Sequence, residues 1–157
     1  MERLRRPRRG GIATGGRRRR GSWARTAAAS PLTFGRLTHR TEGGYGAPRR
    51  WTADASVGLE VQKYGRTTGL TVGRVTGIHA TIDVGYRTGI ARFEDQIVIS
   101  GNGFSAGGDS GSLVVTKGAL LADRRPVGLL FAGATGSTLA NPIGPVLERF
   151  DVHIDGG

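Results

Sequence analysis

The stretch FSAGGDSGSLVVT, residues 104–116, joins a glycine-rich turn directly to an apolar run. Its first part places Ser110 between Asp109 and Gly111, and its last four residues, 113–116, have the composition of a strand. A serine hydroxyl becomes a nucleophile only when it is held rigidly beside a base, and flanking glycines let the backbone turn tightly while leaving room for a substrate. The stretch therefore predicts a nucleophile loop that leads into a buried strand.

Short apolar runs with alternating polar residues surround this loop, and Gly and Thr turns separate them. This sequence pattern is typical of an antiparallel barrel or sandwich. The predicted strands cover residues 57–61, 70–78, 81–86, 93–100, 112–116 and 127–132. A short helix over residues 142–150 is expected to follow them, with Asn141 as its cap and Pro142 at its first position. The pattern predicts an all-β fold of six strands followed by one helix.

Charge divides the chain into two parts. Residues 1–50 carry 14 Arg, no Lys and two acidic residues, whereas residues 51–157 carry nine basic and ten acidic residues. The first part has no apolar periodicity, so we expect a disordered Arg-rich segment over residues 1–55 and a folded domain over residues 56–157. Neither a signal peptide nor a membrane-spanning stretch is visible, so we expect a soluble, unexported chain without membrane contact. The sequence leaves the localisation unknown, with the cytoplasm as the default.

The Arg-rich segment has three interpretations. It could be a plain disordered extension, or a tail that binds nucleic acid through its guanidinium groups, although nucleic acid is the less favoured partner. Arginine without lysine, beside Gly, Ala and Pro, is also what GC-rich DNA yields in a wrong reading frame. Under that third hypothesis, residues 1–55 are a mistranslated or truncated first barrel. The chain has no cysteine, which excludes disulfides and thiolate metal sites, and we expect no cofactor or metal.

Four ordered motifs resemble the trypsin-like serine peptidases, and the bacterial alpha-lytic protease and streptogrisin group in particular. They are QKYGRTTGLTVG at 62–73, the nucleophile loop at 104–113, VGLLFAG at 127–133 and ANPI at 140–143. The similarity spans roughly residues 57–152 and concerns the second barrel of that family only. It implies a six-stranded antiparallel Greek-key barrel with a short C-terminal helix, and a serine endopeptidase that cleaves peptide bonds through an acyl-enzyme.

Carried over residue by residue, the resemblance implies Ser110 as the nucleophile and the N–H groups of Gly108 and Ser110 as the oxyanion hole. Asp109 matches the position that supports this loop, often by pairing with a buried positive group, although a turn aspartate bonded to its own backbone is the alternative. The resemblance also implies that the substrate contacts Phe104, Phe131, Ala132 and Gly133. The expected partner is a peptide or protein substrate.

A catalytic serine also needs a histidine and an acid to orient it, and in the resembled family both belong to the first barrel. The chain offers His39, His79 and His153, but His79 sits within the predicted strand pair and His153 lies in the C-terminal tail. His39 has the family's chain order of histidine before serine and is the candidate base, with Asp54 as its acid. The Gly- and Arg-rich surroundings of His39 argue against this role. We therefore expect the chain to lack the catalytic His and Asp, which leaves its activity open. A first barrel would be lost, unread or supplied elsewhere, and a non-catalytic peptide-binding domain is the alternative.

Overall fold

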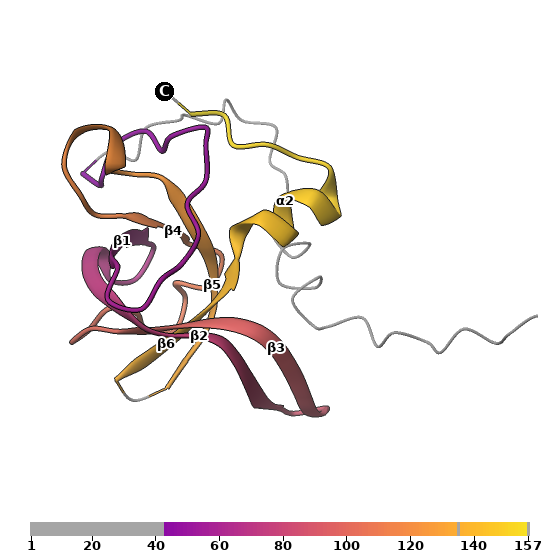
Figure 1. The fold of residues 1–157 in the computed structure, drawn as a ribbon. Coiled ribbons are helices and arrows are strands. Elements are labelled where there is room, and N and C mark those ends of the chain that lie inside the picture. The colour runs from indigo at the N-terminus through magenta and orange to yellow at the C-terminus, as the bar shows by residue number, and fades with distance from the viewer. Residues whose placement is uncertain (1–42, 135, 157) are drawn as a thin grey trace, which may run out of the picture.

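A computed structural model describes residues 43–134 and 136–156 of the chain. Six antiparallel strands form a closed barrel in the order β1-β2-β3-β6-β5-β4 (Figure 1). The strands are β1 (Glu60–Gly65), β2 (Gly69–Tyr86), β3 (Gly89–Ser100), β4 (Leu113–Thr116), β5 (Pro126–Ala134) and β6 (Ser137–Pro142). The 3₁₀ turn η1 (Leu120–Ala122) lies between β4 and β5, and helix α2 (Ile143–Phe150) follows β6. The predicted six-stranded barrel with a short C-terminal helix is confirmed.

Apolar side chains fill the interior of the barrel, as expected for a barrel of this small size. Every strand contributes at least one of them, and the loop before β4 adds an aromatic ring. The buried cluster consists of Val61, Val75, Ile97, Ile99, Phe104, Val114, Val127, Leu130 and Ala140. The core therefore depends on closure of the whole barrel, because no two neighbouring strands could bury it alone.

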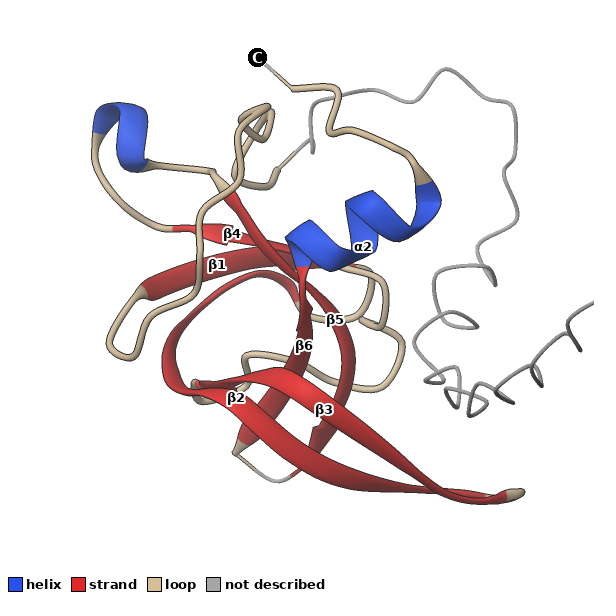
Figure 2. Cartoon of the chain, turned by 45° about the vertical axis from the view of Figure 1, so that its right-hand side comes forward, coloured by secondary structure: helices blue, strands red, loops and turns tan. Residues whose placement is uncertain are grey.

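β2 is a single long strand, whereas the sequence predicted two separate strands at 70–78 and 81–86. The break was expected near His79, and the structure places a bend there: His79 has φ of 53° and the pairing of β2 with β3 shifts register on both sides of Ala80. The polypeptide continues through the bend without a turn. Beyond it, β2 and β3 form a twisted ribbon that projects from the barrel (Figure 2).

β6 was not predicted from the sequence. Its residues read STLANP, which lacks the apolar alternation of a half-buried strand. The fold nevertheless pairs β6 with β3 on one side and β5 on the other, and buries Thr138 and Asn141. The predicted number of strands was therefore reached through two compensating errors, a divided β2 and a missing β6.

The start of α2 also differs from the prediction. Pro142 is the N-cap residue instead of the first helical residue, and no side chain caps the helix. Asn141 instead belongs to β6 and is 4% exposed. Ile143 and Val146 anchor the helix on the barrel. No helix among the described residues is long and apolar enough to cross a membrane.

Residues 43–55 lie against the barrel, although the sequence placed them in a disordered segment. The N–H of Arg49 donates to the carbonyl of Arg124 and that of Ala53 to the carbonyl of Pro126, both at 2.8 Å. These backbone hydrogen bonds leave no trace in residue composition, which explains why the boundary at residue 56 was expected. The remainder of the Arg-rich segment, residues 1–42, lies outside the described residues, as do its predicted interpretations.

Candidate functional site: a serine loop held by a buried aspartate

The carboxylate of Asp109 is the anchor of the predicted nucleophile loop. Its Oδ2 atom lies 3.0 Å from Nζ of Lys63 on β1, and both side chains are fully buried. Oδ2 also accepts hydrogen bonds from the Thr68 hydroxyl at 2.7 Å and the Ala106 N–H at 3.1 Å, while Oδ1 accepts the Thr67 N–H at 2.8 Å. The aspartate thus joins its own loop to β1 and to the turn between β1 and β2.

Two opposing effects act on the pKa of the Asp109 carboxyl. Burial is the largest single effect and raises the pKa, because it disfavours the charged form. Hydrogen bonds from Thr68, Thr67, Lys63 and Ala106 stabilise the carboxylate and outweigh burial. The result is a pKa held far below its usual range, so Asp109 is ionised at neutral pH and forms a charge-assisted pair with Lys63.

Glycines give the loop its shape. Gly108 has φ of +101°, and a Cβ atom at this position would lie 2.6 Å from Oγ1 of Thr67. Gly111 has φ of +92°, and its N–H donates to the Leu130 carbonyl on β5 at 2.7 Å. The N–H of Leu130 in turn donates to the Ser112 carbonyl at 3.0 Å. The C-terminal side of the serine turn is therefore fixed to β5.

Ser110 lies exposed at the tip of this turn. Its hydroxyl donates to the backbone carbonyl of Phe131 on β5 at 3.3 Å. Within the part of the chain that the structure describes, the backbone N–H groups of Gly108 and Ser110 donate to no other residue. In the same loop, the N–H groups of Asp109 and Ser112 are both hydrogen-bonded. The turn thus presents two N–H donors that have no partner within the described residues. Beside them is the Ser110 hydroxyl, which is bonded to the Phe131 carbonyl.

The four predicted substrate-contacting residues occupy different environments. Phe104 belongs to the buried core and is 1% exposed, with Nζ of Lys63 lying 5.8 Å from its ring centre. The ring of Phe131 is also buried, against Phe93 at 4.6 Å between ring centres. Ala132 is half-buried and Gly133 is exposed, both on β5. Of these four residues, only Ala132 and Gly133 are therefore more than slightly accessible to solvent.

Two hydroxyl groups beside Gly133 were not anticipated. Ser105 and Thr138 share a hydrogen bond of 2.6 Å between their hydroxyl oxygens, and a Cβ atom on Gly133 would lie 3.1 Å from the Ser105 hydroxyl. Thr138 was missed because β6 was missed. This hydroxyl pair lies next to Gly133, with Ser105 half-buried and Thr138 buried.

Lys63 and Thr68 are the other residues that sequence reasoning did not single out, although the resemblance led us to expect a buried positive group near Asp109. One signal was available: Lys63 is the only lysine before residue 117, and it lies in an apolar alternating run. A cation expected in the interior of a strand needs a buried anion. The sequence did not identify the matching anion, because Asp109 lies 46 residues away.

No histidine contacts Ser110 among residues 43–134 and 136–156. His79 lies on β2, where its Nδ1 atom is 2.5 Å from Oδ1 of Asp95, and His153 follows α2. His39, the weak candidate for a base, lies outside the described residues, and Asp54 is an exposed residue before β1. The described residues also contain no group of three or more His, Cys, Asp or Glu side chains that could hold a metal ion.

Comparison with known proteins supports the fold. Residues 51–150 match the family of the Nal1 C-terminal domain. A search of curated protein sequences finds no match. Among solved structures, a glutamic acid specific serine protease is 26% identical to this chain, with a TM-score of 0.52. The aligned region covers 69% of this chain and 55% of the protease chain. Its reported use of a histidine triad in substrate binding belongs to that protein.

Two further structures agree with this result. Cellulomonas bogoriensis chymotrypsin is 24% identical with a TM-score of 0.53, over 70% of this chain and 57% of its own. Thermobifida fusca protease A is 24% identical with a TM-score of 0.55, over 71% of this chain and 56% of its own. This chain therefore spans about half the length of these bacterial serine proteases, and the predicted resemblance to one trypsin-like barrel, the second, is confirmed.

Proposed function

The chain belongs to the family of the Nal1 C-terminal domain, and we propose that it is the nucleophile-bearing barrel of a serine endopeptidase. Ser110 is the nucleophile in this proposal, and the N–H groups of Gly108 and Ser110 form the oxyanion hole. The observation that carries it is the geometry of the serine turn. The turn exposes the Ser110 hydroxyl and two N–H groups that have no partner among the described residues, and the buried Asp109 next to Ser110 anchors it.

Asp109 has a positioning role in this proposal. Its carboxylate points into the barrel and is saturated by Lys63, Thr68 and the turn N–H groups, so it cannot act on a substrate. The same bonds leave little freedom to the peptide units on either side of it. A rigid loop keeps the donors aimed at one point, where a developing negative charge gains most from preorganised N–H groups.

The chemical step requires a base beyond the described residues. In the proposed reaction, the Ser110 Oγ forms a bond to the substrate carbonyl carbon and its proton passes to a histidine. That proton then leaves with the departing amine as the peptide bond breaks, and water hydrolyses the acyl-enzyme. We propose that the histidine and its acid come from a first barrel, which supplies the other side of the cleft.

The substrate in this proposal is an extended peptide beside β5. The Phe131 carbonyl, which the Ser110 hydroxyl now occupies, is free to pair with a peptide N–H once the hydroxyl turns toward the substrate. Gly133 keeps this edge open, since a side chain there would press on Ser105. Phe104, a core residue, has an indirect part only.

A non-catalytic peptide-binding domain is the second candidate. It is favoured by the present state of Ser110, whose hydroxyl donates to a backbone carbonyl and contacts no histidine among the described residues. The same face beside β5 would then bind a peptide without cleaving it. The two candidates differ in the reactivity of Ser110.

Reactivity of Ser110 toward a fluorophosphonate distinguishes them. The reaction forms a bond between Oγ and phosphorus, expels fluoride and gives the hydroxyl proton to a base. Added imidazole can supply that base in solution, so we expect the full chain to be labelled at Ser110 faster as imidazole is raised. Mass spectrometry of the peptide that contains residues 104–116 reports the modified residue.

Ser112→Ala is the matched control, since Ser112 lies in the same turn but its hydroxyl donates to the Asp109 carbonyl at 2.6 Å. Labelling should persist in Ser112→Ala and disappear in Ser110→Ala. If the folded wild-type chain stays unlabelled at every imidazole concentration, Ser110 is not the proposed nucleophile, and the peptide-binding domain is favoured.

A further inference from the structure

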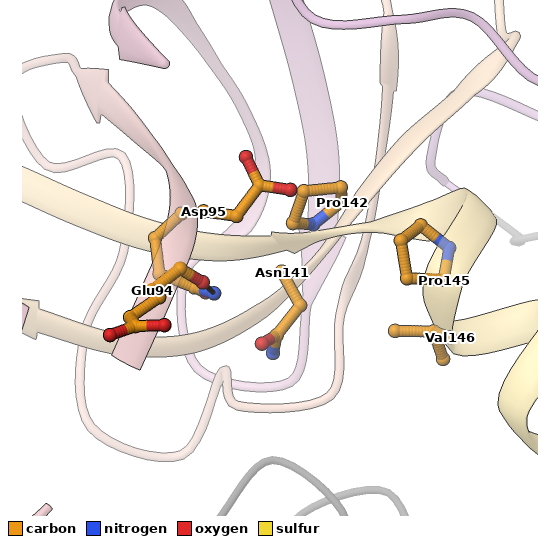
Figure 3. A pocket seen from close by; sticks show the side chains of 7 residues that line it. Glu94, Asp95, Asn141, Pro142, Pro145 and Val146 are labelled. Carbon is orange, nitrogen blue, oxygen red and sulfur yellow. Dashed lines mark hydrogen bonds between the residues drawn. The ribbon is translucent and has the colours of Figure 1, made fainter. Parts of the chain in front are cut away.

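A small pocket lies where the β2–β3 ribbon leaves the barrel, between β3, the end of β6 and the start of α2. Its volume is about 120 Å³. Figure 3 shows Glu94 and Asp95 on one side of this pocket and Pro145 and Val146 of α2 on the other. None of its lining residues belongs to the serine loop or to the substrate face. We call it the ribbon-base pocket.

The backbone of β3 explains why acidic groups gather there. Consecutive side chains of a regular strand point to opposite faces. Asp95, however, has φ of 60° and lies where the pairing of β2 and β3 is irregular. As a result, three consecutive residues, Glu94, Asp95 and Gln96, line the same pocket.

Gln96 provides the observation that points to a ligand. The residue is 4% exposed, and its Nε2 atom donates to the Glu94 carbonyl at 2.6 Å. That bond fixes the orientation of the amide, since a carbonyl can only accept. Its Oε1 atom is then buried with no hydrogen-bond partner. A buried acceptor in this state is unfavourable, and a ligand that donates an N–H group would satisfy it.

The charges at the pocket specify the ligand further. Asp95 is paired with His79, and the nearby Arg92 forms its ion pair with Asp83. Glu94 acts on Arg92 through charge only and forms no ion pair of its own among the described residues. The pocket thus offers one unpaired carboxylate, one unpaired amide oxygen and an apolar wall. These groups fit a cation that has several N–H donors on an aliphatic stem.

We propose that the ribbon-base pocket binds an arginine side chain of a partner polypeptide. Its volume is below the roughly 300–1,000 Å³ typical of small-molecule sites and suits a single side chain. Arginine has five N–H donors in a fixed fork and is less strongly hydrated than lysine. One guanidinium can therefore satisfy both the Glu94 carboxylate and Gln96 Oε1 while its stem packs on Pro145 and Val146. The proposal does not depend on Ser110.

Titration of the full chain with N-acetyl-L-arginine N-methylamide, followed by NMR, tests this proposal. We expect shifts in the side-chain amide of Gln96 and in the backbone amides of residues 94–96 and Val146. The citrulline analogue has the same stem but no charge, and it should bind at least about tenfold more weakly, because a charged hydrogen bond is replaced by a neutral one. Equal binding of the two compounds would overturn the proposal.

Three variants locate the binding. Glu94→Gln should weaken arginine binding by about tenfold or more, since it removes the unpaired charge at an exposed position without altering the fold. Gln96→Met removes the unpaired oxygen and should also weaken binding while thermal unfolding shows an intact barrel. Glu148→Gln, on the exposed face of α2, is the matched control and should bind like the wild type. Unchanged affinity in Glu94→Gln would exclude the ribbon-base pocket as the site.

Discussion

Lys63 Nζ lies 3.0 Å from Asp109 Oδ2, and both side chains are fully shielded from solvent. The pair joins β1 to the serine loop across 46 residues of sequence. A buried ion pair is weak support for stability by itself, because desolvation opposes the attraction. Removing one partner is different, since it leaves an unpaired charge in the interior. The serine loop therefore depends on both residues.

Asp109→Ala should lower the free energy of unfolding by about 3–5 kcal/mol. Asp83→Ala offers a matched comparison, because Asp83 and Arg92 form an ion pair of similar length, 2.9 Å, on the exposed ribbon. Exposed pairs contribute little to stability because water and salt screen them, so this variant should be nearly neutral. Urea unfolding of both variants measures the difference, and similar losses in the two would show that burial of the Lys63 pair has no consequence.

Stability should fall in acid partly through Asp109. Hydrogen bonds hold the pKa of this carboxyl in the folded state below that of an unfolded aspartate, about 3.9. Its contribution is therefore fully present above about pH 4 and is lost as the pH falls from there toward the folded pKa. Urea unfolding between pH 7 and pH 2.5 should show a shallower acid decline in Asp109→Asn than in the wild type. Parallel curves would mean that Asp109 is not the group concerned.

Gly108→Ala and Gly111→Ala separate backbone strain from steric overlap. Both glycines have positive φ, so each alanine should cost about 1–2 kcal/mol from backbone strain. At Gly111 the added Cβ atom meets nothing within 4 Å, but at Gly108 it would lie 2.6 Å from Thr67 Oγ1. Gly108→Ala should therefore be the more destabilising, by a further roughly 1–3 kcal/mol. Equal losses in denaturant unfolding would contradict this description of the turn.

Two isoleucines of β3 compare the barrel with the ribbon. Ile99 is 0% exposed in the core, whereas Ile90 is 79% exposed near the ribbon tip. Ile99→Ala should cost about 2–5 kcal/mol, because it leaves a cavity. Ile90→Ala should change stability by no more than about 0.5 kcal/mol. A large loss from Ile90→Ala in thermal unfolding would show that the ribbon tip is packed against another part of the protein.

The strands that the sequence predicted well are those with apolar residues at most of their buried positions. Ile97 and Ile99 of β3 and Val114 and Val115 of β4 are buried, and the predicted positions of both strands overlap the observed ones. Two of the three buried residues of β6, Thr138 and Asn141, are polar, so its pattern did not indicate a strand. At His79 the alternation itself changes phase, because the backbone bends there, and one strand was taken for two.

For the candidate site, the sequence by itself determined the serine turn: Gly108 and Gly111 supply the positive φ values, and Ser110 stands between them at the exposed tip. Only the tertiary structure decided what holds that turn, since the Lys63 and Thr68 partners of Asp109 come from distant residues that barrel closure brings together. Only the tertiary structure also shows that Phe104 belongs to the core and that Gln96 Oε1 has no hydrogen-bond partner at the ribbon base. Local conformation follows from nearby residues, whereas burial and pairing depend on segments that meet only when the strands close.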